Sequence, residues 1–352
     1  MRASHARLAA LAVVIAFAAF APPRIASADG PVPAQEIRLG LFGACMPSDQ
    51  VGWVVGDLGR VYRTADGGKT WARQEMVGRR PVFSISCVDD QHAWVSSTSG
   101  AIYATADGGS TWKLQQTPSK RNLFKVAFTT LQNGAAVGDF GTMVHTADGG
   151  ATWSEIPLPA DFKLPPAADD QGVMPNDALL YGLTFVDDKN GWLCGEWGTI
   201  LKTEDGGATW KQQVSGVEST LFGIAMRDAQ NGTAVGIDSV ILRTEDGGTT
   251  WKPVQSPFQD RAFYEVAFSG QNGWLAGNQG LVMQSTDGGA SWKQVQTPKE
   301  VWSEWFRGIG LRGDRGLLVG GSGKIYEIKG TEAVLLNPGS GNPHDAEGHG
   351  HS

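Results

Sequence analysis

Residues 64–71 read Thr-Ala-Asp-Gly-Gly-Lys-Thr-Trp, and the same pattern returns five more times along the chain. Each copy opens on Thr or Ser, continues through Asp-Gly-Gly and ends on Trp. The aspartates are spaced 41, 41, 57, 41 and 41 residues apart, at Asp66, Asp107, Asp148, Asp205, Asp246 and Asp287. One interval therefore holds a 16-residue insertion in a regular period of 41 residues. Such a period is typical of β-propeller blades.

One unit shows how the repeat is expected to fold. Strands are predicted at Leu123–Phe128, 135–137, 142–146 and 152–156, with turns between them. Asp-Gly favours a tight hairpin because glycine adopts positive φ without a Cβ clash, and the aspartate side chain accepts hydrogen bonds from nearby amides. The tryptophan then covers the hairpin with a large apolar ring. The motif is thus predicted to join the third and fourth strands of each blade, with the rings of Trp71, Trp112, Trp153, Trp210, Trp251 and Trp292 as covers.

The number of blades follows from the length. A further unit without the motif begins at Phe306, where residues 316–320 match residues 191–195 and residues 323–326 match residues 198–201. We predict an all-β propeller of seven four-stranded antiparallel blades, formed by residues 29–336 as one domain. The last outer strand comes either from residues 332–336 or from the segment around residues 35–38. In either case closure of the ring protects the sheet edges.

The two ends of the chain have different compositions from the repeats. Residues 1–28 read as a signal peptide, with arginines at the start, an apolar stretch over residues 8–21 and Ala-Ser-Ala at residues 26–28. We expect export to the periplasm, or to the thylakoid lumen in a photosynthetic host, with secretion as the second choice. Residues 337–352 form a Gly/Pro/His tail that we expect to be disordered. No later segment has the roughly 20 apolar residues of a membrane-spanning helix.

The net charge bears on the kind of partner, and the cysteine content bears on the possible disulfide. The formal net charge is −7, and removal of the three arginines of residues 1–28 would make it −10, which argues against a nucleic-acid partner. The chain has three cysteines, and Cys45 and Cys87 lie at corresponding positions of neighbouring units. They form either a disulfide or two buried thiols. The sequence does not determine the oligomeric state, and we expect a monomer.

The motif resembles the Asp-box, or bacterial neuraminidase repeat, which specifies a hairpin in sialidases, other glycosidases and non-catalytic propellers. The whole unit is more specific: Gly-Trp-Leu-Cys-Gly-Glu-Trp-Gly-Thr-Ile-Leu-Lys-Thr-Glu-Asp-Gly-Gly-Ala-Thr-Trp at residues 191–210 has counterparts across residues 38–330. This unit resembles the photosystem II stability and assembly factor family. The resemblance implies a seven-bladed propeller, a non-enzymatic assembly or scaffolding role outside a membrane, and an Arg-rich binding surface.

The alternative is a secreted glycan-active protein, either a sialidase-like hydrolase or a glycan-binding propeller. A sialidase needs three arginines on the substrate carboxylate, a tyrosine nucleophile and an acidic pair. The five tyrosines fall where other units carry apolar residues, so we expect them in the core: Tyr62, Tyr103, Tyr181, Tyr264 and Tyr326. Aspartates repeated in six units are structural, and the tail histidines His344, His349 and His351 lack a packed framework. We therefore expect no catalytic residue, metal site or cofactor.

The loops after each second strand and the linkers between blades are expected to share one face, opposite the motif turns. Phe140 and Trp197 lie at loop tips, where apolar side chains favour a protein contact, although their rings folding back over neighbouring blades is equally open. Trp305 precedes the seventh unit and serves either a partner contact or ring closure. The insertion, about residues 158–177, is Pro-rich and lies between blades 3 and 4, as a flap or a tether.

Arginines are expected on the same face. Arg80, Arg121 and Arg261 stand three residues before the first aromatic residue of their inner strands, and Arg38 and Arg307 lie close to the equivalent place. Equivalent positions in a ring would direct these charges toward a common funnel, where they would pair with acidic groups of a membrane protein complex or its exported segments. Capping of linker carbonyls by the same arginines remains open.

Overall fold

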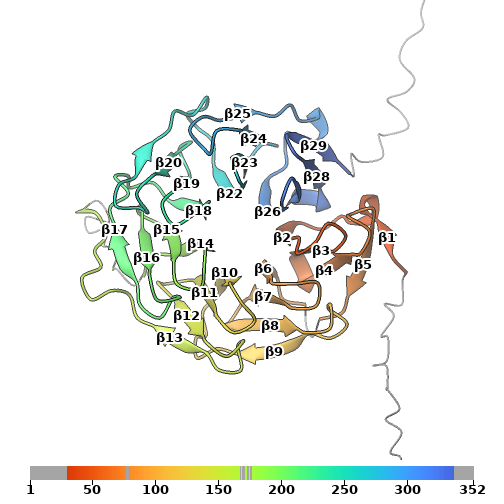
Figure 1. The fold of residues 1–352 in the computed structure, drawn as a ribbon, viewed down its shortest axis with the longest axis horizontal. Coiled ribbons are helices and arrows are strands. Elements are labelled where there is room, and N and C mark those ends of the chain that lie inside the picture. The colour runs from red at the N-terminus through yellow and green to blue at the C-terminus, as the bar shows by residue number, and fades with distance from the viewer. Residues whose placement is uncertain are drawn as a thin grey trace, which may run out of the picture.

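The computed structural model describes residues 30–76, 79–166, 168, 171–172, 174 and 177–336. Seven antiparallel sheets stand around a central axis, six with four strands and one with five (Figure 1). Four strands of each blade follow one another from the axis outward, and in the five-stranded blade the first strand of the chain is added at the outer edge. The prediction of a seven-bladed all-β propeller is therefore confirmed, whereas the predicted signal peptide and tail lie outside the described residues.

Every blade is a continuous stretch of the chain. Blade 1 contains β1 (Val32–Pro33), β2 (Leu41–Cys45), β3 (Gly52–Gly56), β4 (Val61–Thr64) and β5 (Thr70–Gln74), and blade 2 contains β6 (Val82–Cys87), β7 (Ala93–Ser97), β8 (Ala101–Thr105) and β9 (Lys113–Gln116). Blade 3 contains β10 (Leu123–Phe128), β11 (Gly134–Gly138), β12 (Met143–Thr146) and β13 (Ser154–Ile156), and blade 4 contains β14 (Leu180–Phe185), β15 (Gly191–Gly195), β16 (Ile200–Thr203) and β17 (Lys211–Gln213). Blade 5 contains β18 (Leu221–Met226), β19 (Gly232–Gly236), β20 (Ile241–Thr244) and β21 (Lys252–Pro253). Blade 6 contains β22 (Phe263–Ser269), β23 (Asn272–Gly277), β24 (Val282–Ser285) and β25 (Lys293–Gln294), and blade 7 contains β26 (Phe306–Arg312), β27 (Arg315–Gly320), β28 (Ile325–Lys329) and β29 (Glu332–Leu335). Short 3₁₀ turns occupy Ala34–Glu36, Asp57–Gly59, Lys299–Val301 and Gly321–Gly323.

The ring closes between blades 7 and 1, which lie side by side in Figure 1. Of the two segments considered for the last outer strand, the C-terminal one forms it, as β29. The N-terminal segment instead lies at the outer edge of blade 1, where β1 pairs with β5, and it packs Ile37 with Val319 and Ile325 of blade 7. The Gln35 Nε2 also donates to the Leu336 carbonyl at 3.0 Å.

Neighbouring blades depend on one another for burial. All five residues of β15 are buried, as are those of β3, β7, β11 and β19. A second strand is covered on both faces because its blade stands between two others, which explains why these strands consist mainly of glycine and apolar residues. Trp192 of blade 4, for example, shares a core with Ile224 and Leu242 of blade 5.

A covalent link adds to this packing at one junction. Cys45 and Cys87 form a disulfide between β2 and β6, with their Cα atoms 6.2 Å apart. The bond joins blades 1 and 2, and it decides between the two alternatives that the sequence left open. Cys194 is a free, buried thiol, and burial raises its pKa.

The motif hairpins are built by hydrogen bonds to one aspartate. In blade 3, Asp148 accepts from the Thr146 hydroxyl at 2.8 Å, the Thr152 amide at 2.8 Å and the Thr152 hydroxyl at 2.6 Å. Gly149 and Gly150 adopt positive φ of 73° and 87°, which lets the turn close around the carboxylate. These bonds, first from the Thr152 hydroxyl and then from the Thr152 amide, lower the Asp148 pKa to about 2.

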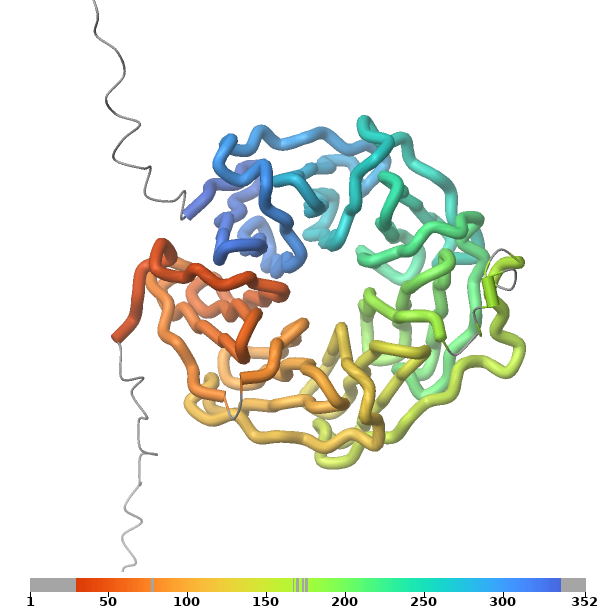
Figure 2. The backbone as a smooth tube through the Cα atoms, turned by 180° about the vertical axis from the view of Figure 1, so that it is seen from behind, coloured from red at the N-terminus to blue at the C-terminus, as the bar shows by residue number. Residues whose placement is uncertain are grey.

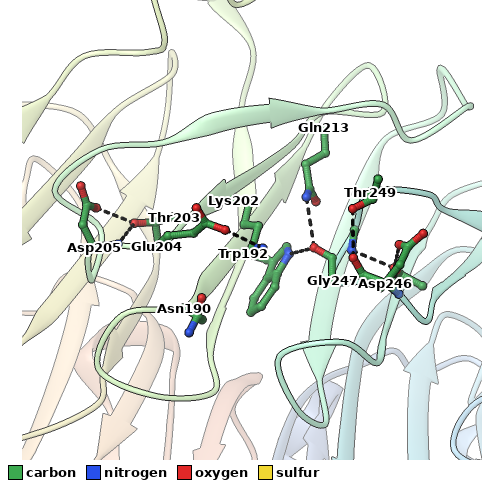
Figure 3. A network of polar contacts seen from close by, with 12 residues as sticks. Asn190, Trp192, Lys202, Thr203, Glu204, Asp205, Gln213, Asp246, Gly247 and Thr249 are labelled. Carbon is green, nitrogen blue, oxygen red and sulfur yellow. Dashed lines mark hydrogen bonds and ion pairs between the residues drawn. The ribbon is translucent and has the colours of Figure 1, made fainter.

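Three of the hairpins are fastened to the preceding blade by a glutamine in that blade's fourth main strand. The Gln213 Nε2 of blade 4 donates to the Gly247 carbonyl in the motif turn of blade 5 at 3.2 Å (Figure 3). The Gln213 Oε1 accepts from Trp251 Nε1 at 3.3 Å. Trp192 Nε1 donates to the same carbonyl at 3.1 Å. Gln74 and Gln115 make the equivalent pairs of bonds from blades 1 and 2.

Blades without this glutamine confirm its role by contrast. Ile156 and Val254 occupy the equivalent position in blades 3 and 5. In blade 4, which follows blade 3, Trp210 Nε1 donates to the Gly207 carbonyl of its own hairpin at 3.0 Å. In blade 6, which follows blade 5, Trp292 Nε1 has no hydrogen-bond partner within the described residues. The glutamine therefore satisfies a buried donor that the motif itself creates.

Replacing the glutamine tests this account. We expect Gln213→Leu and Gln115→Leu each to lower the free energy of unfolding by about 2 kcal/mol, because each leaves a buried indole N–H without its acceptor. Urea unfolding followed by tryptophan fluorescence measures the change. Gln255→Leu, at an exposed glutamine, is the matched control. Equal losses in all three variants would show that the glutamine does not stabilise the blade junction.

The lowered pKa of Asp148 gives a second test. Its folded value of about 2 lies below the ordinary 3.8, so this carboxylate adds stability that is complete above about pH 4 and is lost as the pH falls through about 2. We therefore expect Asp148→Asn to be less stable than the wild type at pH 5 and to approach the wild-type stability near pH 2.

Urea unfolding between pH 2 and pH 6 measures this convergence. Asp161→Asn is the control, since Asp161 is exposed in the insertion and belongs to no motif. A constant stability difference between wild type and Asp148→Asn over the whole range would contradict the account.

Candidate functional site

The loops after the second strands and the linkers between blades lie together, as expected. The Asp139 amide donates to the Asn122 carbonyl at 3.0 Å, and the Gly141 amide to the Ala178 carbonyl at 2.7 Å, so loop and linker touch at both borders of blade 3. We call the surface formed by these loops and linkers the linker face. The motif turns occupy the opposite ends of the third strands and hence the opposite face.

Each loop on the linker face holds two consecutive residues in the left-handed region. The second is a glycine in six of the seven blades and Ser239 in blade 5. The first has φ between 49° and 59°, and these first residues are Leu58, Ser99, Phe140, Trp197, Asp238, Gln279 and Ser322. The backbone is therefore the same from blade to blade while the side chain differs. Leu58 and Phe140 are exposed, at 52% and 45%.

Trp197 is placed differently from Phe140. Its ring is partly buried and packs against the core cluster that includes Phe162 and Leu164 of the insertion. The reading in which this ring folds back is therefore the one the structure shows. Phe140 remains the exposed aromatic loop tip.

The insertion is more tightly packed than its proline content predicts. Phe162, Leu164 and Ala168 are buried in the blade 3 and blade 4 core. The Lys163 amide donates to Gln212 Oε1 at 2.9 Å, and Gln212 Nε2 donates back to the Lys163 carbonyl at 2.7 Å. Figure 2 shows the segment running along the outside of the ring. Its described part is thus fixed to blade 4 and does not cover the axis.

Arg121 and Phe140 meet beside the insertion. The guanidinium lies over the Phe140 ring, 4.2 Å from its centroid. Both residues line a groove of about 850 Å³ with Glu155, Leu158 and Pro159. The groove offers a cation and apolar surface side by side on the linker face.

The other arginines do not gather in this groove. Arg261 pairs with Asp260 at 3.5 Å and lies over Phe258, while Arg38 and Arg80 are exposed. Arg307 is also exposed, but it lines a central cavity. The structure thus places the five arginines at several points of the linker face, with only Arg307 on the wall of that cavity.

Trp305 packs at the junction between blades 7 and 1. Its ring stacks on Phe42 of blade 1, with centroids 5.3 Å apart and an interplanar angle of 13°. Trp302, three residues earlier, is 55% exposed and donates its Nε1 to the Thr297 carbonyl at 3.3 Å.

The central cavity is created by a repeated irregularity in the inner strands. In all seven blades the pairing of the first and second strands shifts register at the second residue of the inner strand. A bulge of this kind redirects a side chain out of the regular alternation. The redirected residues are Phe42, Phe83, Phe124, Tyr181, Phe222, Tyr264 and Arg307, and all seven line the cavity.

The six aromatic members, here called the aromatic ring, touch in sequence around the axis. Their successive centroid distances from Phe42 to Tyr264 are 6.5, 5.5, 5.4, 5.0 and 5.4 Å. The Arg307 guanidinium continues the series at 4.8 Å from the Tyr264 centroid. Burial, followed by the nearby Glu196 charge, raises the Tyr181 pKa to about 12, so its hydroxyl is neutral at physiological pH.

An ion pair lies at the next position along the inner strands. Lys125 of blade 3 and Glu265 of blade 6 pair directly, although 140 residues separate them. Both line the same cavity of about 220 Å³, which we call the central funnel. Four other blades have glycine here, and at Gly308 an added Cβ would lie only 2.8 Å from the Gly43 Cα. Glycine therefore lets adjacent inner strands approach one another. In blades 3 and 6 the same position instead places a charged side chain in the funnel wall.

The prediction that all tyrosines belong to the core is wrong for two of them. Tyr181 and Tyr264 are half-buried and line the funnel, whereas Tyr103 and Tyr326 are buried. The bulge is the reason, since it turns the second inner-strand residue toward the axis. The sequence did carry a signal: a pair of adjacent large apolar residues, such as Leu123-Phe124, interrupts the alternation at the start of the inner strands.

The described residues contain neither a metal site nor a membrane-spanning helix. No group of three or more His, Cys, Asp or Glu side chains there has metal-binding geometry, and the tail histidines lie outside that part of the chain. None of its helices has the length and apolarity needed to cross a membrane.

The fold is shared with solved structures of low sequence identity. A YCF48 structure with a bound D1 peptide matches with a TM-score of 0.68 and 19% identity, covering 85% of this chain and 95% of that one. YCF48 from Cyanidioschyzon merolae matches with a TM-score of 0.66 and 19% identity, covering 85% and 98%. A catalytically inactive virginiamycin B lyase from Staphylococcus aureus, solved with quinupristin, matches with a TM-score of 0.67 and 14% identity, covering 85% and 98%. No curated protein matches the sequence.

The family comparison agrees with the repeat. The family model described as photosynthesis system II assembly factor YCF48 matches residues 78–172 and 210–333, which is more than half of the chain. The matched ranges run from blade 2 into the insertion and from the motif of blade 4 into blade 7. The chain therefore belongs to the photosynthesis system II assembly factor YCF48 family.

Proposed function

We propose that this protein is an exported, non-enzymatic assembly or stability factor that docks exported segments of a membrane protein complex on its linker face. The observation that carries the proposal is the contrast between the two faces. Six nearly identical hairpins form the motif face, whereas the linker face varies from blade to blade in its loop tips, arginines and insertion. Variation on a constant backbone is how a repeat protein acquires a specific partner.

The partner class follows from the family and from one relative. The YCF48 structure noted above holds a D1 peptide, so that relative accepts a polypeptide segment. We extend the same class of partner, a photosystem II membrane protein or an equivalent membrane protein of a non-photosynthetic host, to this chain. Residues 1–28 support the location, since a signal peptide would carry the propeller to the side of the membrane where such segments emerge.

The groove beside the insertion suits an acidic, partly apolar segment. Arg121 is held over Phe140 and is exposed, so it offers hydrogen-bond donors next to an aromatic surface. In a chain of net charge −7, cations on the linker face also favour encounters in one orientation. Arg80 and Arg261 extend this field along the same face.

A glycosidase function has less support. Glycosidases of the usual kind use two carboxyl groups about 5 to 10 Å apart. The wall of the central funnel contains one carboxylate, Glu265, and it is paired with Lys125. The aspartates of the motifs hold hairpins and lie on the opposite face. These features favour a binding function over hydrolysis.

Capture of a client tests the proposal. We expect the immobilised protein to retain a specific membrane protein from detergent-solubilised membranes of its own source, and Arg80/Arg121/Arg261→Glu to retain at least about tenfold less, because three charges reverse on the docking face. Mass spectrometry identifies the client, and the purified client then gives the dissociation constants.

The matched control is Lys69/Lys113/Lys293→Glu, which makes the same charge change at exposed lysines beside the motif turns. Retention that is equal for the wild type and both triple variants would contradict docking through the linker face. Absence of any retained membrane protein would contradict the assembly role itself.

A further inference from the structure

We infer that the central funnel is an anchor site for one aromatic side chain of a partner polypeptide, and that Arg307 pairs with a carboxylate next to that side chain. This inference rests on the proposed function and names where and how a partner segment would be gripped. It assigns recognition to the aromatic ring and Arg307, and it is independent of the groove that contains Arg121.

The size of the funnel fits a side chain better than a free ligand. Pockets for small molecules usually have volumes of about 300 to 1,000 Å³. The funnel has about 220 Å³, which suits one large side chain inserted from a segment that stays outside. Anchors of this kind, a single aromatic residue in a preformed pocket, carry much of the binding energy at many protein interfaces.

The wall has the chemistry for an aromatic guest. All six members of the aromatic ring are only partly buried, and they already contact one another in edge-on, stacked or tilted pairs. A guest ring gains the same offset and edge contacts on several sides at once. The inner-strand bulges position the six aromatic side chains before the guest enters, so these side chains lose little conformational freedom on binding.

The charges favour a guest with an acidic neighbour. Lys125 and Glu265 neutralise each other in the funnel wall, so the wall keeps one net positive charge, on Arg307. No ion pair within the described part of the chain includes Arg307, and its guanidinium is exposed beside Tyr264. A carboxylate flanking the inserted ring would complete a charge-assisted pair there.

Model peptides test the inference directly. A soluble Gly/Ser peptide with one central Trp-Glu pair is compared with peptides in which that pair is Ala-Glu, Trp-Gln or Trp-Lys, with dissociation constants from NMR titration. We expect the Trp-Glu peptide to bind at least about tenfold more tightly than the Ala-Glu peptide, and more tightly than the Trp-Gln and Trp-Lys peptides. Equal affinity for Trp-Glu and Ala-Glu, or no binding of either, would overturn the aromatic anchor.

Protein variants locate the site. Phe124→Ala and Arg307→Gln should each weaken binding of the Trp-Glu peptide about tenfold, whereas Phe140→Ala and Arg121→Gln, matched changes outside the funnel, should not. Because Phe124→Ala removes half-buried surface, Arg307→Glu provides a test that does not depend on packing. This exposed charge reversal should switch the preference from Trp-Glu to Trp-Lys, and an unchanged preference would remove Arg307 from the proposal.

Three further outcomes separate this inference from a small-molecule site and from the proposed function. If phenylacetate competes as well as the peptide at equal concentration, the funnel is a small-molecule site and the polypeptide anchor is wrong. If Phe124→Ala captures the membrane client as well as the wild type while the Arg80/Arg121/Arg261→Glu variant does not, the anchor fails and the assembly function stands. Peptide binding in the funnel without any captured client would leave the anchor and contradict the assembly role.

Discussion

A blade of this protein has a second strand that is apolar on both faces, and a single blade cannot shield that strand from water. Trp192 in β15 is fully buried only because blade 5 covers it, and the same holds around the ring. Closure is therefore a condition for burial in every blade. The packing of Ile37 against blade 7 and the stacking of Trp305 on Phe42 complete the circle without a strand exchanged between the chain ends.

The same constraint separates the two faces of the ring. The motif face must fasten each third and fourth strand, and it does so with an aspartate that collects hydrogen bonds and a tryptophan that needs an acceptor. Three glutamines in neighbouring blades supply that acceptor, which couples each of those hairpins to the blade before it. The linker face has no such task beyond the short loop bonds, so its side chains are free to vary. Partner recognition is consequently expected where the repeat is least strict.

The repeat period made the fold predictable, because Asp-Gly-Gly turns and an interval of 41 residues leave few alternatives to a propeller. Strand bounds in blade 3 agree within two residues with those expected from alternation. The position of side chains was less predictable. A bulge at the second inner-strand residue is a tertiary feature, so Tyr181 and Tyr264 were assigned to the core although they face the funnel. Arg80, Arg121 and Arg261 stand at equivalent sequence positions, yet none of them lines the funnel, and Arg121 instead lies over Phe140 of its own blade's loop.

Departures from the repeat indicate where this member of the family differs from a plain scaffold. Six inner strands place an aromatic residue at the bulge and the seventh places Arg307, while glycine gives way to Lys125 and Glu265 at the next position. None of these three residues is needed for closure, since the other blades close without them. Lys125 and Glu265 come from opposite parts of the ring and neutralise each other, so the remaining charge lies at Arg307. The funnel wall presents six aromatic side chains and, within the described residues, one unpaired cation, so we expect it to prefer an aromatic guest beside an acidic group. A scaffold that binds no partner would have no need of such a preference.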